Sequence, residues 1–219
     1  MGIESRRVRE FEVDLTSFGR TSDSITIPAV LADLVSRRRA IVMYVGRIQS
    51  SKGALDLLDA FLRLPADAAA ASTLVFVGDG VDMPVLRSRV AQLGSDSVLL
   101  LGAVPHGQLP AVMRMATLIA TPTQPQLPEG RCMVALEAMV LGIPVVAPNF
   151  AAFPYAVRHG VNGLLFEAGS IPALAECLAR VIGDPGLHSE LSAGAAQSGR
   201  ELIAGFTSFG AAVEAAFGA

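Results

Sequence analysis

Short apolar runs that recur between longer segments of helical spacing are the feature that most constrains the fold of this chain. Glycine or proline bounds each run, and the intervals are too long for β-hairpins. Runs of this kind are typical of strands buried on both faces of a parallel sheet. We therefore expect an α/β, Rossmann-like fold with helices on both faces of the sheet. The predicted strands are 41–46, 73–78, 98–102, 117–121, 144–148 and 163–166.

The connections between these strands predict where a ligand would bind. Each crossover between parallel strands should be right-handed, and a ligand should lie beyond the carboxyl ends of the strands, where the strand order reverses. After residue 166 the pattern is helical, and Asp184-Pro185-Gly186 predicts a turn between two helices. A last helix is expected around 208–217.

Composition narrows the class of protein. The 219 residues, 52% of them apolar, are enough to bury about 70% of the surface of the unfolded chain. Residues 1–24 are polar and are expected to be a leader or linker, which leaves 25–219 as the folded domain. The net charge of -3 argues against nucleic acid as a partner.

The apolar runs and the two cysteines indicate the cellular compartment of the protein. The N-terminus has no apolar segment of the signal-peptide kind, and no run reaches the roughly 18 residues that an integral membrane span needs. Cys132 and Cys177 lie far apart without a metal-ligand pattern, as expected of buried free thiols in a reducing compartment. We therefore expect a cytoplasmic protein.

Two cations follow the first predicted strand. Gly46 and Arg47 stand at its carboxyl end, Lys52 comes five residues after Arg47, and Gly53 begins the next helix. A helix N-terminus with an arginine and a lysine can hold both groups of a diphosphate through charge-assisted hydrogen bonds. Taken alone, the same two residues could equally be a solvated pair beside a turn.

Two carboxylates flank a later helix. Glu129 stands before its first residues, after the loop that follows the strand at 117–121, and Glu137 lies about two turns further on. Gly142 is expected to end this helix at its C′ position. Each acid alone could simply complement the helix dipole or be solvated.

Several motifs follow one another in one order along the chain. In that order and spacing they resemble the donor-binding half of retaining glycosyltransferases related to glycogen and sucrose synthases, the glycosyl transferases group 1 family. The resemblance covers roughly residues 40–217. The motifs are GR…SKG at 46–53, FVGDG at 76–80, E-x7-E within EGRCMVALEAM at 129–139, GIPVVAPN at 142–149 and HGVNGLLFE at 159–167.

The resemblance implies a role for each candidate residue. Arg47 and Lys52 would neutralise the diphosphate of a nucleotide sugar, and Gly46 and Gly53 beside them are also predicted to bind the donor. Glu129 would hydrogen-bond hydroxyls of the donor sugar and is the candidate catalytic residue, whereas Glu137 would accept hydrogen bonds from the ribose. The implied enzyme is a retaining hexosyltransferase with no cofactor and no metal, since the two cations stabilise the leaving diphosphate and no Asp-x-Asp motif is present.

The sequence also departs from the family pattern. Family members usually have a Gly-Gly pair and then a glutamate where this chain has Ala151, Ala152 and Tyr155. A methyl group is unfavourable where the backbone needs a positive φ or a close approach. These residues suit an alternative function, a non-catalytic nucleotide-sugar binder or assembly subunit. An epimerase of similar architecture matches the motifs less well.

Family enzymes place their site between two domains, and we expect the acceptor-binding domain to be absent here. Residues 1–39 are too few for one, because a full domain takes about 100 residues or more. The expected partners are a nucleotide sugar and an acceptor-binding domain or subunit in trans. The sequence leaves open whether the chain is a fragment or one subunit of a split enzyme, and which base, sugar and acceptor it uses.

Overall fold

One parallel sheet organises the structure. The computed structural model describes residues 15, 18, 28–126 and 130–204. In these residues six strands pair in parallel, in the order β3-β2-β1-β4-β5-β6, which confirms the predicted α/β, Rossmann-like class. The strands are β1 (Ala40–Val45), β2 (Ser72–Val77), β3 (Val98–Gly102), β4 (Leu118–Ala120), β5 (Val145–Pro148) and β6 (Gly163–Phe166).

Strand β1 shows why these apolar runs form buried strands. Successive side chains of a strand point to opposite faces, so a run that is apolar throughout needs a core on both sides. Val42 and Tyr44 lie in one hydrophobic core, whereas Ile41 and Met43 lie in the other. All four side chains are buried. The sheet therefore separates two cores.

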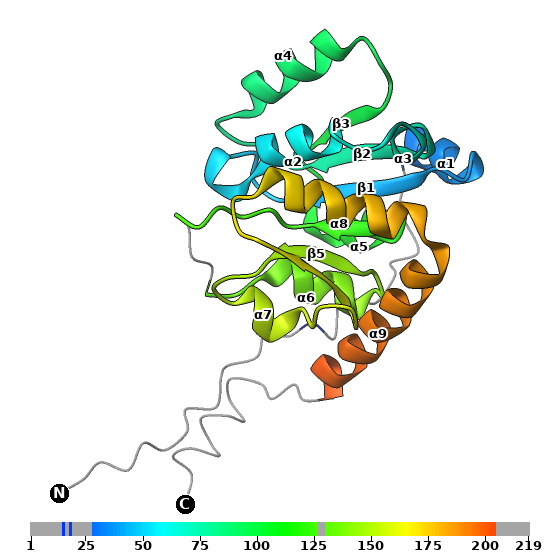
Figure 1. Ribbon diagram of the computed structural model, residues 1–219, viewed down its shortest axis with the longest axis vertical. Helices are drawn as coiled ribbons and strands as arrows, with labels where there is room; N and C mark the ends of the chain where they lie inside the picture. The colour runs from blue at the N-terminus through cyan, green and yellow to red at the C-terminus, as the bar shows by residue number, and fades with distance from the viewer. Residues whose placement is uncertain (1–14, 16–17, 19–27, 127–129, 205–219) are drawn as a thin grey trace, which may run out of the picture.

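Helices cover both faces of the sheet (Figure 1). Buried residues of α2, α4 and α8 join one core, and those of α1, α5 and α6 join the other. The long helices α8 and α9 follow the last strand, as the helical pattern after residue 166 predicts. The helices are α1 (Ala29–Ser36), α2 (Ala54–Phe61), α3 (Ala66–Ala71), α4 (Met83–Leu93), α5 (Leu109–Met113), α6 (Met133–Val140), α7 (Phe153–Ala156), α8 (Ile171–Gly183) and α9 (Pro185–Ala204), with short 3-10 turns at Ser50–Lys52 and His106–Gln108.

The ends of the helices follow from local sequence, with one correction. Gly142 has φ +73° and donates its N–H to the Met139 carbonyl at 2.9 Å, which ends α6 as predicted. The turn predicted at Asp184-Pro185-Gly186 is shorter than expected. Only Asp184 separates α8 from α9, because Pro185 is the first helical residue, a position where its missing N–H and fixed φ are tolerated.

Some predictions fall mostly outside the described residues. The helix expected around 208–217 does so entirely. Of the leader predicted at 1–24, only Leu15 and Phe18 are described, and both are buried. Across the described ranges, no helix is long and apolar enough to cross a bilayer.

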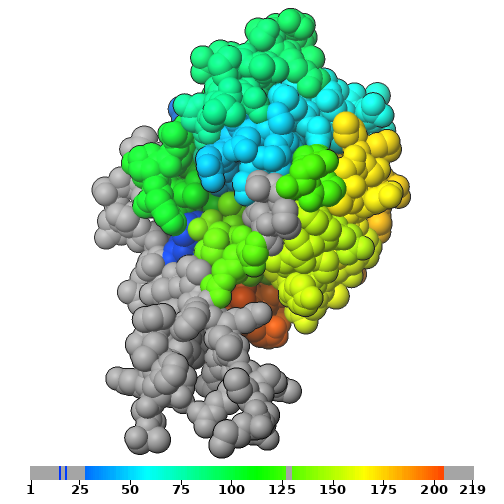
Figure 2. Space-filling model, turned by 90° about the vertical axis from the view of Figure 1, so that its left-hand side faces the viewer, coloured from blue at the N-terminus to red at the C-terminus, as the bar shows by residue number. Residues whose placement is uncertain are grey.

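The strand order places a switch point between β1 and β4. The chain runs from β1 outward to β2 and β3, then returns to the other side of β1 to form β4, β5 and β6. The crossovers therefore diverge at this point, and the loops leaving β1 and β4 leave a crevice between them. Figure 2 looks onto this carboxyl edge, where the cyan region of α2 meets the yellow-green region around α6. The candidate site lies here.

Candidate functional site

The loop that leaves β1 has a defined conformation. The Tyr44 hydroxyl donates to the Arg47 carbonyl at 2.6 Å, directly after the end of the strand. A 3-10 turn at Ser50–Lys52 follows, and the N–H and hydroxyl of Ser50 both donate to one carboxylate oxygen of Asp82. These contacts hold the backbone that carries Arg47 and Lys52 at the edge of the sheet.

Gly53 joins this loop to the one that follows β4. Its φ of +73° is left-handed, and a Cβ atom at this position would lie 1.8 Å from the carbonyl oxygen of Pro122. Only glycine meets both conditions without strain. Gly53 therefore sets the approach of the two loops that flank the switch point.

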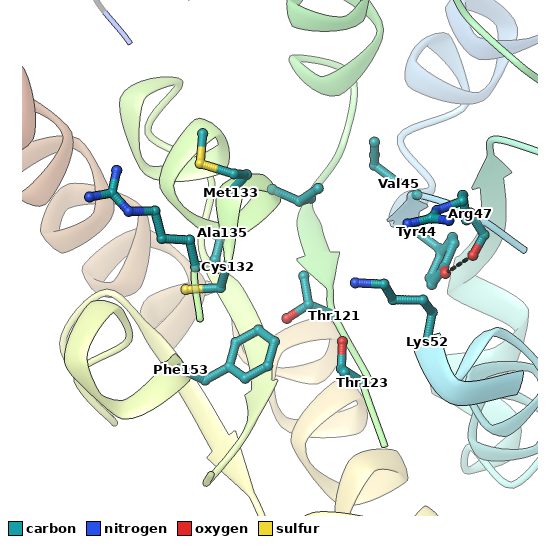
Figure 3. Close-up of a pocket in the computed structure, with 13 residues that line it drawn as sticks. Tyr44, Val45, Arg47, Lys52, Thr121, Thr123, Cys132, Met133, Ala135 and Phe153 are labelled. Atoms are coloured by element: carbon teal, nitrogen blue, oxygen red, sulfur yellow. Dashed lines mark hydrogen bonds between the residues drawn. The ribbon is translucent and has the colours of Figure 1, made fainter. Parts of the chain in front are cut away.

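A cavity of about 270 Å³ lies between these loops and the start of α6. The strand ends, the β1 loop, the residues after β4 and the first turn of α6 all contribute to its wall. Arg47 and Lys52, predicted as a pair, do share one cavity (Figure 3). The lining residues are Tyr44, Val45, Gly46, Arg47, Lys52, Thr121, Thr123, Arg131, Cys132, Met133, Val134, Ala135 and Phe153.

The charge of this lining is positive. Arg47 and Arg131 are exposed, Lys52 is half-buried, and none of the thirteen lining residues is an aspartate or glutamate. The whole chain carries a net charge of -3, so the cations are a local feature rather than a general one. The cavity therefore favours an anionic ligand. A ligand with two or more negative charges could contact more than one of these cations.

The helix that begins at this cavity is α6. Its N-cap residue Cys132 makes no side-chain capping hydrogen bond, and Met133, Val134 and Ala135 line the cavity. The first N–H groups of a helix and its positive dipole end favour anions. The sequence indicated the start of α2 for this role, but Gly53 and α2 contribute no lining residue. The helix N-terminus at the cavity therefore belongs to α6.

Of the two glutamates, one is described. Glu129 lies outside the described residues. Glu137, on α6, is only 7% exposed, and burial raises its pKa from 4.5 to about 7. It is not among the residues that line the cavity. Burial thus favours the protonated form of this carboxyl group.

The three departures from the family motif lie in the segment after β5, Ala151 and Ala152 before α7 and Tyr155 within it. Ala151 has φ +51°, the left-handed conformation that glycine adopts without cost, whereas Ala152 has φ -77°. The Tyr155 side chain is 92% exposed. Phe153, the first residue of α7, is buried and lines the cavity. Of the two alanines, only Ala151 therefore stands where the chain uses a glycine-like conformation.

Sequence reasoning missed several lining residues. Thr121 and Thr123 follow β4, and Arg131 precedes α6. The available signal was two hydroxyl residues at the carboxyl end of a strand beside the switch point, in ATPT at 120–123. Lys52, Thr121 and Thr123 line one cavity, and Figure 3 shows the Thr121 hydroxyl oxygen turned toward Cys132 and Phe153.

Other polar residues have structural contacts. His159 accepts a hydrogen bond from the Leu165 N–H at 3.0 Å, and His188 contacts the Thr117 carbonyl at 3.0 Å. Cys132 and Cys177 are buried and form no disulfide, as predicted. Within the described part of the chain, no group of three His, Cys, Asp or Glu side chains is arranged to hold a metal ion.

Comparison with known families identifies this architecture. The family model described as Glycosyl transferases group 1 matches residues 33–198, which include all six strands and the cavity. The chain belongs to the glycosyl transferases group 1 family. The family resemblance drawn from the motifs is thereby confirmed.

Curated relatives agree with this assignment. A D-inositol 3-phosphate glycosyltransferase of Salinispora arenicola is 36% identical over 75% of this chain and 40% of its own length. A GDP-mannose-dependent alpha-(1-6)-phosphatidylinositol monomannoside mannosyltransferase of Mycobacterium tuberculosis is 32% identical over 72% of this chain and 43% of its own length. This glycosyl transferases group 1 chain thus spans about two fifths of the length of these relatives.

Solved structures share the fold. HepE of Anabaena, in complex with UDP, aligns with a TM-score of 0.72 and 24% identity over 94% of this chain and 54% of that protein. The C-terminal domain of the glycosyl transferase group 1 family protein LpcC from Francisella tularensis aligns with a TM-score of 0.68 and 22% identity, over 90% of this chain and 99% of that domain. An isolated domain of this family therefore has the same architecture and extent.

Proposed function

We propose that this chain binds a nucleoside diphosphate sugar and forms the donor side of a retaining hexosyltransferase. The observation that carries the proposal is the convergence of Arg47, Lys52 and the α6 N-terminus on one cavity, whose thirteen described lining residues include no carboxylate. A diphosphate leaving group carries negative charge that such groups stabilise.

The proposed roles divide the donor among the candidate residues. Arg47 and Lys52 would bind the diphosphate, Glu137 the ribose hydroxyls, and Glu129 the sugar. No divalent metal is included, because the two cations would stabilise the charge that develops on the diphosphate. Glu137 is buried in the ligand-free chain. To bind the ribose, its side chain would turn toward the ligand, or the ribose would contact it at the edge of the cavity.

Relatives support a nucleotide sugar as the donor class. The name of the Mycobacterium tuberculosis relative specifies GDP-mannose, and HepE was solved with UDP. These names differ in the base but share the diphosphate, the group that Arg47 and Lys52 would bind. The whole enzyme would act when this chain is joined by an acceptor-binding domain.

Calorimetric titration of the 219-residue chain tests the donor site. UDP, GDP and ADP should each be compared with their monophosphates, with and without EDTA. At least one diphosphate should bind about tenfold more tightly than its monophosphate, because a charge-assisted contact to the second phosphate contributes about 1.5–3 kcal/mol. EDTA should have no effect.

Matched variants locate the binding site. Arg47→Ala and Lys52→Ala should each remove most of the preference for diphosphate, whereas Arg87→Ala, an exposed arginine on α4, should leave it unchanged. Equal affinity of the wild-type chain for every diphosphate and its monophosphate would contradict the proposal.

A second candidate function is a non-catalytic nucleotide-sugar binder or assembly subunit. Two observations favour it, the positive φ of Ala151 and the replacement of a usual glutamate by exposed Tyr155. A radiolabelled-donor assay separates the two functions. Transfer should require an added acceptor-binding partner, because the acceptor hydroxyl must be positioned beside the anomeric carbon. Donor binding without transfer, even with a partner that forms a complex, would favour the binder.

A further inference from the structure

Thr121 carries a hydroxyl group without a partner at the candidate site. The residue follows β4 directly and is 8% exposed. Its backbone N–H donates to the Val146 carbonyl at 2.9 Å, so its main chain takes part in the sheet. Its Oγ1 atom is buried and makes no hydrogen bond. Burying a hydroxyl without a hydrogen-bond partner is unfavourable, so the presence of threonine at this position needs an explanation.

Other buried hydroxyls in the described residues show what a structural role looks like. Ser72 donates to the Ala68 carbonyl at 2.6 Å, and Ser198 donates to the Gly194 carbonyl at 2.9 Å. Thr73, on β2, is fully buried, and its Oγ1 atom is likewise without a partner. Thr73 lines no part of this cavity, whereas Thr121 does. Only Thr121 of these two combines an unpartnered hydroxyl with a place at the candidate site.

The surroundings of Thr121 indicate what its hydroxyl would meet. Lys52 and Thr123 line the same cavity from one side, whereas the Thr121 hydroxyl oxygen points toward Cys132 and Phe153 on the opposite wall (Figure 3). The described lining residues of this cavity include cations and no carboxylate, a composition that favours anions, whose oxygens accept hydrogen bonds. A threonine hydroxyl can donate one, and rotation about its Cα–Cβ bond between staggered positions can redirect the oxygen.

We propose that Thr121 binds the donor directly, with its hydroxyl donating a hydrogen bond to an oxygen of the diphosphate. This inference rests on the proposed function, because it needs a nucleoside diphosphate in the cavity. The ligand would supply the hydrogen-bond acceptor that the hydroxyl lacks in the free chain. Thr121 is therefore a donor-binding residue outside the motifs by which the sequence was first interpreted.

The test measures affinity for the best-bound nucleoside diphosphate in four chains. Thr121→Val keeps the shape of the side chain but removes the hydroxyl, and should weaken binding about tenfold, as expected for one hydrogen bond to a charged group. Thr121→Ser keeps the hydroxyl and should bind within about threefold of the wild type. Thr73→Val removes the other unpartnered hydroxyl and should leave the affinity unchanged.

Thermal unfolding of the ligand-free chains supplies a second measurement. Both valine variants should have an unchanged or raised Tm, since each replaces an unpartnered hydroxyl by a methyl group. Weaker binding by Thr121→Val with an intact fold supports the inference. If that variant does not fold, Thr121→Ala replaces it under the same criterion.

The outcomes separate this inference from the proposed function. If the wild-type chain binds no nucleoside diphosphate, the proposed function fails, and the inference fails with it. If the wild type binds and Thr121→Val binds equally well, the inference alone is overturned. Equal weakening by Thr121→Val and Thr73→Val would also overturn it, because the effect would then be general to the sheet.

Discussion

Replacing Glu137 by glutamine should stabilise the ligand-free chain at neutral pH and remove a pH dependence of its stability. Burial raises the pKa of this carboxyl group from 4.5 to about 7. Between these values the folded chain holds the proton more tightly than the unfolded chain does. The free energy of unfolding therefore falls as the pH rises from about 4.5 to about 7, and stays at the lower value above that.

The size of this effect follows from the same shift. Each pH unit of difference between the folded and unfolded pKa corresponds to about 1.4 kcal/mol, so ionised Glu137 lowers the stability above pH 7 by about 3 kcal/mol. Glutamine has nearly the same shape and no charge. Glu137→Gln should thus be about 2–3 kcal/mol more stable than the wild type at pH 8, and about equal to it near pH 4.5.

Urea denaturation at intervals between pH 4.5 and pH 8 measures both chains. Glu176→Gln, on the exposed side of α8, is the matched control, since it removes the same charge from a solvated position. The control should follow the wild-type curve. If the Glu137→Gln and wild-type curves stay parallel over the whole range, burial of an ionisable Glu137 does not govern this stability, and the reasoning is refuted.

The same substitution connects stability to the proposed function. A carboxylate that accepts hydrogen bonds from ribose must be ionised, so nucleoside diphosphate affinity in the wild type should fall as the pH drops below about 7. Glu137→Gln should bind more weakly at pH 8 and lose this pH dependence. A variant that is more stable yet binds less well is expected where a buried charge is kept for function.

Two further predictions concern the backbone beside the cavity. Ala151→Gly should raise the free energy of unfolding by about 0.5–1 kcal/mol because Ala151 has φ +51°, whereas Ala152→Gly, at φ -77°, should lower it by a similar amount; chemical denaturation that shows the same sign for both would refute this account. Gly53→Ala should lower the free energy of unfolding by more than about 2 kcal/mol, because its Cβ would lie 1.8 Å from the Pro122 carbonyl oxygen. Gly107→Ala, where a Cβ meets nothing within 4 Å, is its control, and equal thermal stability of the two variants would contradict the packing argument.

Much of the fold follows from local patterns in the sequence. A run such as IVMYV at 41–45 is apolar at every position, which requires a core on both faces and hence a parallel sheet. Glycine at 142 ends α6 because a left-handed residue is easiest without a side chain. The pairing of Arg47 with Lys52 was also predictable, since only four residues of one short loop separate them. These features depend on neighbours in the chain.

Contacts between distant segments were decided by the tertiary structure alone. The strand order brings Thr121 after β4 beside Lys52 after β1, although 68 positions of sequence separate them in the chain. The cavity takes its helix N-terminus from α6 rather than α2, and the burial of Glu137 depends on what packs around α6. The sequence by itself determined the strands, the long helices and the loop that holds Arg47 and Lys52, because periodicity and glycine placement act locally. Packing of those elements decides which side chains line the same cavity and which carboxyl group is buried away from solvent. No local pattern in the sequence encodes that packing.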